Sequence, residues 1–231
     1  MKSDNSIKLN CFTPPVSLAT FVIETAFAVY ILARYRRDRF VYGVGAVLLC
    51  LGIFQLSEYM MCTGGDIWWW LRVGHVAITM LPPLGLHLVR METNSRGRMS
   101  VWIAYALATA FSIAFFILPD ALNAVTCAGK FVAFHSDGIV NRTYGLYYLG
   151  ILFWGIVELF IGLKHKTGDS ILMQWMIAGY ASFLVPTAVV YVLVTQAHIG
   201  IASIMCGFAI LLAMVLVFKI IPRHRELNLP H

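Results

Sequence analysis

The sequence predicts an all-α membrane protein, a bundle of seven transmembrane helices. Of its 231 residues, 60% are hydrophobic and only 12% are charged, whereas a soluble domain carries roughly 25% charged residues. The mean hydropathy is +0.78. Seven apolar runs are long enough to cross a bilayer as helices, which takes about 20 residues each. These observations exclude a soluble domain and predict a single polytopic domain over residues 1–231.

The seven predicted spans follow one another without an internal repeat or an interdomain linker. They cover Val16–Ala33, Phe40–Met61, Ile67–Val89, Met99–Leu118, Thr143–Gly162, Ile171–Val194 and Ile199–Ile221. Residues 1–10 are polar and are not followed by a cleavable signal peptide, so the first span is expected to be retained. The one long connection, residues 119–142, is predicted to cap the bundle or to close a binding site. Residues 222–231 form a short predicted tail.

The distribution of Lys and Arg predicts the orientation of the chain. Twelve of the 17 basic residues flank the connections after the first, third and fifth spans or the end of the seventh. The positive-inside rule then places the N-terminus outside and the C-terminus in the cytoplasm. The net charge of +6 is therefore a topology signal and does not indicate a nucleic-acid partner. A multi-pass protein of a bacterial inner membrane is the predicted location.

Three of the spans carry polar side chains at a spacing that places them on one helix face. The spacing i, i+3, i+7 joins Ser17, Thr20 and Glu24 in the first span, Gln55, Glu58 and Cys62 in the second, and Arg72, His75 and Thr79 in the third. Ionisable groups inside a membrane are costly and usually face the interior of the bundle. We therefore predict a polar pocket in the outer half, with a ligand bound by Glu24, Gln55, Glu58, Arg72, His75 and Thr79.

Counting residues from the ends of the spans predicts which of these groups meet. With a rise of about 1.5 Å per residue, Glu24 and His75 both lie roughly 12 Å below the outer boundary, and Glu58 and Arg72 about 5 and 8 Å below it. A Glu58–Arg72 ion pair and a Glu24–His75 hydrogen bond are expected. Glu24 and His75 are also the candidates for a metal site, although no metal or cofactor is identified. Structural contacts between helices are the competing interpretation, at about 0.6 kcal/mol each.

A second polar pair is predicted nearer the cytoplasm, where His87 in the third span and Glu158 in the fifth lie roughly 5 and 9 Å from that boundary. Proline also marks two spans. Pro82-Pro83 in the third span and Pro186 in the sixth remove backbone donors and are expected to kink both helices.

Three cysteines fall on the predicted outer side: Cys11, Cys62 and Cys127. Oxidising conditions there permit a disulfide, and three thiols allow at most one bridge. We expect Cys127 to pair with Cys62 or with Cys11, which would anchor the long loop. Cys50 and Cys206 lie within spans and are expected to pack as small apolar residues.

Two resemblances bear on these predictions. The opening Cys11-Phe12-Thr13-Pro14-Pro15-Val16-Ser17, together with Phe54-Gln55-Leu56-Ser57-Glu58, resembles an uncharacterised bacterial family of small seven-helix membrane proteins. Members of that family begin with Cys-Phe-Ser, whereas this chain has Thr13 and ten residues before Cys11. More distantly, Trp70–Val89, with its Leu-Pro-Pro-Leu, is similar to the third helix of the seven-helix sensor region of bacterial histidine kinases. Neither resemblance implies catalytic residues.

Several classes of seven-helix protein fit poorly. A retinal protein needs a lysine in the middle of the last helix, and Lys219 lies at its cytoplasmic end. The receptor motifs Asp-Arg-Tyr and Asn-Pro-x-x-Tyr are absent from the third and seventh spans. Zinc hydrolases of the membrane need a histidine pair on one helix, but His75 and His87 lie more than three turns apart.

The sequence therefore predicts a sensor or receptor-like module that binds a small ligand or ion in an outer-half polar pocket. It would act in the lipid bilayer through a membrane protein partner or as a homo-oligomer. A small transporter or proton-coupled channel is the alternative, and an intramembrane metalloenzyme is the third hypothesis. Enzymatic activity is not favoured.

Overall fold

The computed structural model describes residues 14–35, 38–93, 98–118, 122–127, 132–135, 139–193 and 201–227. The elements in chain order are α1 (Pro14–Arg34), α2 (Arg39–Cys62), α3 (Ile67–Thr79), α4 (Leu81–Thr93), α5 (Arg98–Ile117), β1 (Asn123–Cys127), β2 (Val132–His135), α6 (Ile139–His165), α7 (Ser170–Leu193), α8 (Ile201–Val215), the π-helical turn η4 (Leu216–Ile220) and α9 (Ile221–Leu227).

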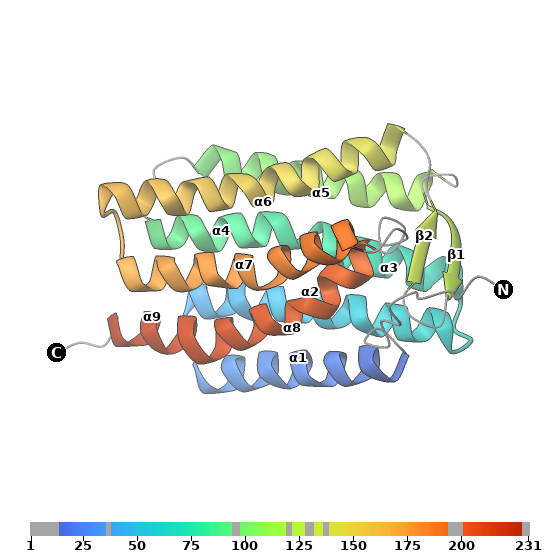
Figure 1. Cartoon of the computed structure of the whole chain (residues 1–231), viewed down its shortest axis with the longest axis horizontal. Helices are drawn as coiled ribbons and strands as arrows, with labels where there is room; N and C mark the ends of the chain where they lie inside the picture. The colour runs from blue at the N-terminus through green and yellow to red at the C-terminus, as the bar shows by residue number, and fades with distance from the viewer. Residues whose placement is uncertain are drawn as a thin grey trace.

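The helices lie side by side along the long axis of the molecule (Figure 1). Within the described residues, six helical segments are long and apolar enough to cross a membrane, and α8, η4 and α9 together supply the last of them. The remaining crossing is made by α3 and α4, which follow one another along the same path. The predicted seven-helix bundle is confirmed, and it has the architecture of a multi-pass membrane protein.

The two ends of the bundle differ in what gathers there. The C-terminal ends of α1, α4 and α6 lie at the same end as α9, while β1 and β2 lie at the opposite end, where α2 meets α3 (Figure 1). Arg34, Arg90, Lys164 and Arg223 belong to the first of these ends. The basic residues are thus grouped at one end, as the sequence predicted. The assignment of this end to the cytoplasm stays a prediction.

Aspartates begin two of the helices that form the candidate site. Asp38 accepts hydrogen bonds from the backbone N–H groups of Phe40 at 2.9 Å and Val41 at 3.4 Å, and so caps α2. Asp66 accepts from the N–H of Trp69 at 3.2 Å and caps α3. Such caps satisfy backbone donors that have no partner within the helix. Between the two helices, Gly64 takes a φ of +100°, a conformation that favours glycine.

The long connection 119–142 contains two short antiparallel strands that the sequence analysis did not predict. In their register, Asn123 faces His135 and Cys127 faces Val132. The strands are rich in Val, Thr and Phe, residue types that favour extended backbone. In the sequence, these two runs are too short to be distinguished from an irregular loop. The helix that follows begins at Ile139, four residues before the predicted start of its span.

The predicted kink in the third crossing is confirmed as a break at Met80, between α3 and α4. Pro83 has no N–H, so the carbonyl oxygen of Thr79 loses its acceptor role in the helix. The hydroxyl of Tyr147, from α6, donates to that oxygen at 2.8 Å. A side chain from another helix therefore replaces the missing backbone donor. In contrast, α7 continues as a helix through Pro186.

We predict that Tyr147→Phe destabilises the protein by about 1–3 kcal/mol, because it leaves the buried Thr79 carbonyl without a donor. Thermal unfolding in detergent measures the change. In a Pro83→Ala background the new N–H can bond to the Thr79 carbonyl, so the same Tyr147→Phe change should have a clearly smaller effect. Equal losses in both backgrounds would show that Tyr147 does not compensate for the proline.

Candidate functional site

All six side chains that the sequence assigned to the binding pocket are buried where α2 packs against α1 and α3. The exposed fractions are 0% for Glu24 and Thr79, 2% for Gln55, 3% for Arg72, 4% for Glu58 and 7% for His75. We call these six residues the polar cluster. The stripe in α1 also buries Ser17 and Thr20. The i, i+3, i+7 spacing therefore identified the buried faces correctly.

Two glycines show how the three helices are aligned. A Cβ atom at Gly52 would lie 3.2 Å from Oγ1 of Thr25, and one at Gly74 would lie 3.0 Å from Cβ of Ser57. From these contacts and a rise of about 1.5 Å per residue, three levels follow. Arg72 and Glu58 lie within about 1.5 Å of the same level, as do His75 and Gln55, and Glu24 lies about 3 Å deeper than Gln55 and about 4.5 Å deeper than His75.

Hydrogen-bonding capacity is left unused in the polar cluster. Among the described residues, both carboxylate oxygens of Glu24, Nε2 of Gln55 and Nε of Arg72 have no hydrogen-bond partner. A buried polar group with no partner costs about 1–3 kcal/mol, and more when it is charged. The cluster is therefore a place where the fold alone does not satisfy its own polar groups.

The hydroxyl groups in and beside the cluster direct their protons along their own helices. Thr20 donates to the carbonyl oxygen of Val16 at 2.9 Å, and Ser57 donates to that of Ile53 at 2.8 Å. Thr79 donates to the His75 carbonyl at 2.6 Å, and its oxygen also lies 3.1 Å from the Tyr144 hydroxyl. The hydroxyl oxygens of Thr20 and Ser57 therefore keep their lone pairs as acceptors.

The predicted Glu58–Arg72 ion pair does not form among the described residues, although the two residues lie at the same level. The Nη1 atom of Arg72 donates to the Trp68 carbonyl oxygen at 3.1 Å, and its guanidinium carbon lies 4.0 Å from the centroid of the Trp68 ring. Long basic side chains near a helix end extend toward the interface, where solvation is better. The indole, one turn nearer that end, holds the cation there.

The predicted Glu24–His75 hydrogen bond is also wrong. His75 uses Nδ1 to donate to the Leu71 carbonyl at 2.9 Å, and its ring packs edge-on against Phe115 at 5.4 Å between centroids. Glu24 lies about 4.5 Å deeper than His75, because the predicted starts of their spans, Val16 and Ile67, do not lie at the same height. In the part of the chain that the structure describes, no group of three or more His, Cys, Asp or Glu side chains could hold a metal ion. The metal candidates Glu24 and His75 thus gain no third ligand there.

The second predicted pair, His87 and Glu158, is wrong as well. Glu158 accepts from Nη2 of Arg90 at 2.5 Å and from the indole N–H of Trp154 at 3.0 Å. His87 is exposed, and its Nδ1 lies 3.3 Å from the Tyr105 hydroxyl. Arg90 lies one turn after His87 on the same helix and supplies a full charge that neutral histidine lacks. The sequence analysis counted Arg90 as a loop residue and so missed it as the partner.

The described residues test only part of the cysteine prediction. Cys62 is half-buried at the end of α2 and is disulfide-bonded. Cys11 and the Cys127 side chain lie outside the described residues, so the identity of the cysteine that pairs with Cys62 stays a prediction. Cys50 is a free, half-buried thiol within α2, as expected of a packing residue.

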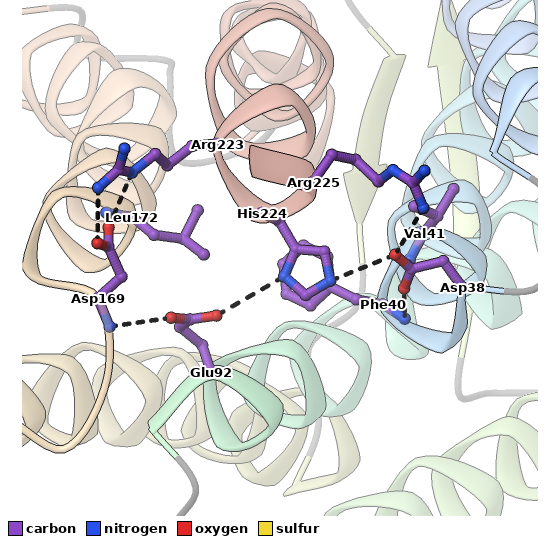
Figure 2. Close-up of polar contacts among 9 residues, drawn as sticks. All are labelled: Asp38, Phe40, Val41, Glu92, Asp169, Leu172, Arg223, His224 and Arg225. Atoms are coloured by element: carbon purple, nitrogen blue, oxygen red, sulfur yellow. Dashed lines mark hydrogen bonds and ion pairs between the residues drawn. The ribbon is translucent and has the colours of Figure 1, made fainter. Parts of the chain in front are cut away.

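A polar network at the α9 end of the bundle was not predicted from the sequence (Figure 2). It joins three carboxylates from separate connections and helix ends to three basic residues of α9: Asp38, Glu92, Asp169, Arg223, His224 and Arg225. We call these six residues the α9 network. Only its two arginines stood out in the sequence, as topology signals.

The strongest contact of the α9 network is a two-pronged ion pair. Arg223 donates from Nε to Oδ1 of Asp169 at 3.2 Å and from Nη2 to Oδ2 at 2.8 Å. Asp169 also caps α7, because it accepts from the N–H of Leu172 at 2.7 Å. The Arg223 hydrogen bond is the main cause that lowers the pKa of the Asp169 carboxyl below its ordinary value. His224 lies between Asp38, at 3.4 Å, and Glu92, at 3.9 Å.

We predict that Asp169→Asn lowers the unfolding temperature at pH 7 and that this difference vanishes in acid. Because the folded-state pKa of Asp169 is lowered, its ionised form stabilises the protein above the unfolded pKa of about 4 and that stability is lost as the pH falls through the folded value. Asparagine keeps an oxygen for the α7 cap, so the change isolates the ion pair. Thermal unfolding from pH 7 to pH 3 tests this, with the exposed Glu226→Gln as the control.

Comparison with known proteins does not assign the chain to a family. No protein-family model matches it, and no curated protein matches it. The resemblance of Cys11–Ser17 and Phe54–Glu58 to an uncharacterised seven-helix family remains a prediction. The polar cluster is therefore interpreted from its own geometry.

Proposed function

We propose that the chain is a sensor or receptor-like membrane module that binds a small ligand or ion in the polar cluster. In this proposal the N-terminal end of α1 faces the outside and α9 faces the cytoplasm, which follows from the basic residues at the α9 end. A membrane protein partner or a second copy of the chain would receive the signal. A disulfide from Cys62 to Cys127 or Cys11 would hold the outer connection over the site.

The observation that carries the proposal is the unused hydrogen-bonding capacity of Glu24, Gln55 and Arg72. Charged groups that only join helices pair with an opposite charge, as Arg90 and Glu158 do at the other end. Polar atoms left without partners in a membrane interior destabilise the fold, and proteins keep such strain mainly at functional sites. The polar cluster fits a binding site better than structural contacts between helices.

The packing beneath the polar cluster favours binding over transport. On the α9 side of Glu24, α1 and α2 bury an apolar layer with at most 5% exposure: Ala28, Ile31, Val44, Val47 and Leu48. A polar path that continues through the bundle would have to cross this layer. A ligand of the site would therefore exchange from one side of the layer only.

A small transporter or proton-coupled channel remains the second candidate, because the third crossing is broken at Met80 next to the cluster residue Thr79. Broken helices are a recurring feature of transporter binding sites. Ion or proton flux into proteoliposomes would favour this candidate. An intramembrane metalloenzyme receives no support from the described residues, which offer no set of three metal ligands.

We predict that Gln55→Leu raises the unfolding temperature by about 2–8 °C, because it removes a buried donor that has no partner. Thermal unfolding in detergent, with N-methyl-D-glucamine as the only added cation, measures the shift without a small ion in the site. The matched control is Glu158→Leu, which strands the Arg90 guanidinium and should lower the temperature. A loss of stability in Gln55→Leu similar to that in Glu158→Leu would mean that the polar cluster is a structural contact.

A further inference from the structure

We propose that the ligand of the polar cluster is a small monovalent cation of the sodium class, held by the Glu24 carboxylate. The proposal rests on the proposed function and specifies the chemistry of that site. Glu24 has 0% exposure, and neither of its carboxylate oxygens has a hydrogen-bond partner among the described residues. An ionised carboxylate in this position needs a positive charge beside it.

The Glu24 carboxylate oxygens are unpartnered acceptors and the Thr20 hydroxyl oxygen beside them also accepts, which selects a cation over an anion. Thr20 lies one turn from Glu24 on the same buried face, and its hydroxyl proton is directed to the Val16 carbonyl. On α3, the Thr79 hydroxyl donates to the His75 carbonyl at 2.6 Å, and its oxygen also lies 3.1 Å from the Tyr144 hydroxyl. Hard cations such as Na⁺ and Ca²⁺ are bound in proteins by oxygen ligands of this kind.

The charge balance of the cluster calls for one positive charge. Among the described residues, the other buried titratable groups of the cluster are Glu58 on α2 and Arg72 and His75 on α3. An ionised Glu24 adds one negative charge that has no hydrogen-bonding partner among them. One monovalent ion brings this to zero, whereas a divalent ion would leave an excess positive charge in the membrane.

The close packing of the site limits the size of the ion. The Cβ positions of Gly52 and Gly74 lie 3.2 and 3.0 Å from side-chain atoms of the neighbouring helices, so α1, α2 and α3 approach one another closely. A bulky organic cation would require these helices to separate. We therefore expect Na⁺ to bind more tightly than K⁺, and N-methyl-D-glucamine not to bind.

Thermal unfolding of the full chain in detergent tests the proposal, at constant ionic strength and pH, with NaCl replacing N-methyl-D-glucamine chloride. Binding to the folded state should raise the unfolding temperature in a saturable way, by about 5–10 °C when Na⁺ exceeds its dissociation constant 100-fold. Glu24→Gln should abolish the response. Glu158→Gln, which changes a partly buried carboxyl at the other end, should keep it. Glu24→Asp, which moves the carboxylate by one methylene, should shift the midpoint of the Na⁺ titration to a higher concentration. This variant replaces Glu24→Gln as the test if Glu24→Gln does not fold.

Three results would overturn the cation proposal: no response to Na⁺, a response that persists in Glu24→Gln, or stability that follows pH but not Na⁺. The last result would mean that a proton alone neutralises Glu24. The proposed function is judged separately by Gln55→Leu. If that change stabilises the protein while Na⁺ has no effect, the binding site stands and its ligand is not a cation. If it destabilises the protein and Na⁺ has no effect, both proposals fail.

Discussion

The absence of water in a membrane interior is the constraint on which the rest of this structure depends, because every buried polar group must then find a partner within the protein. The chain meets this requirement by several routes. Hydroxyl groups donate to carbonyls of their own helix, Tyr147 replaces the donor that Pro83 lacks, and Arg90 neutralises Glu158. The polar cluster departs from this pattern, since Glu24 is fully buried and its carboxylate oxygens have no partner among the described residues. Among the described residues, Glu24 is the one fully buried carboxylate with neither oxygen hydrogen-bonded, which makes the polar cluster the candidate site.

The α9 network shows the opposite behaviour at the other end of the bundle. Its carboxylates serve two purposes, because Asp38 and Asp169 cap the helices α2 and α7 and also contact His224 and Arg223 of α9. Helix α2 connects the two regions: Asp38 lies at its start, and Gln55 and Glu58 lie near its end, about 30 Å away along the axis. A displacement of α2 on ligand binding would therefore reach the contacts that hold α9. This gives the proposed sensor a physical connection between its site and its opposite end.

The seven crossings and the buried polar stripes were predictable because they depend on local rules, namely span length and helical spacing. Glu24, Gln55 and His75 all face the interior as that spacing requires. The pairings were not predictable, since they depend on the relative height of helices and on side-chain direction. Glu24 and His75 differ in depth, Arg72 extends toward Trp68, and Glu158 pairs with Arg90 in place of His87. The β1–β2 hairpin and the α9 network join segments far apart in sequence, where a single chain offers no spacing rule.

An experimental density map of the protein purified in sodium-containing buffer, in the region bounded by Glu24, Gln55 and His75, tests the central claim most directly. The account predicts a discrete peak within about 2.3–3.2 Å of a Glu24 carboxylate oxygen, at a distance suited to coordination or hydrogen bonding. A Glu24 side chain hydrogen-bonded to another residue of the chain, with no such peak beside it, would contradict the account and identify the polar cluster as a structural contact.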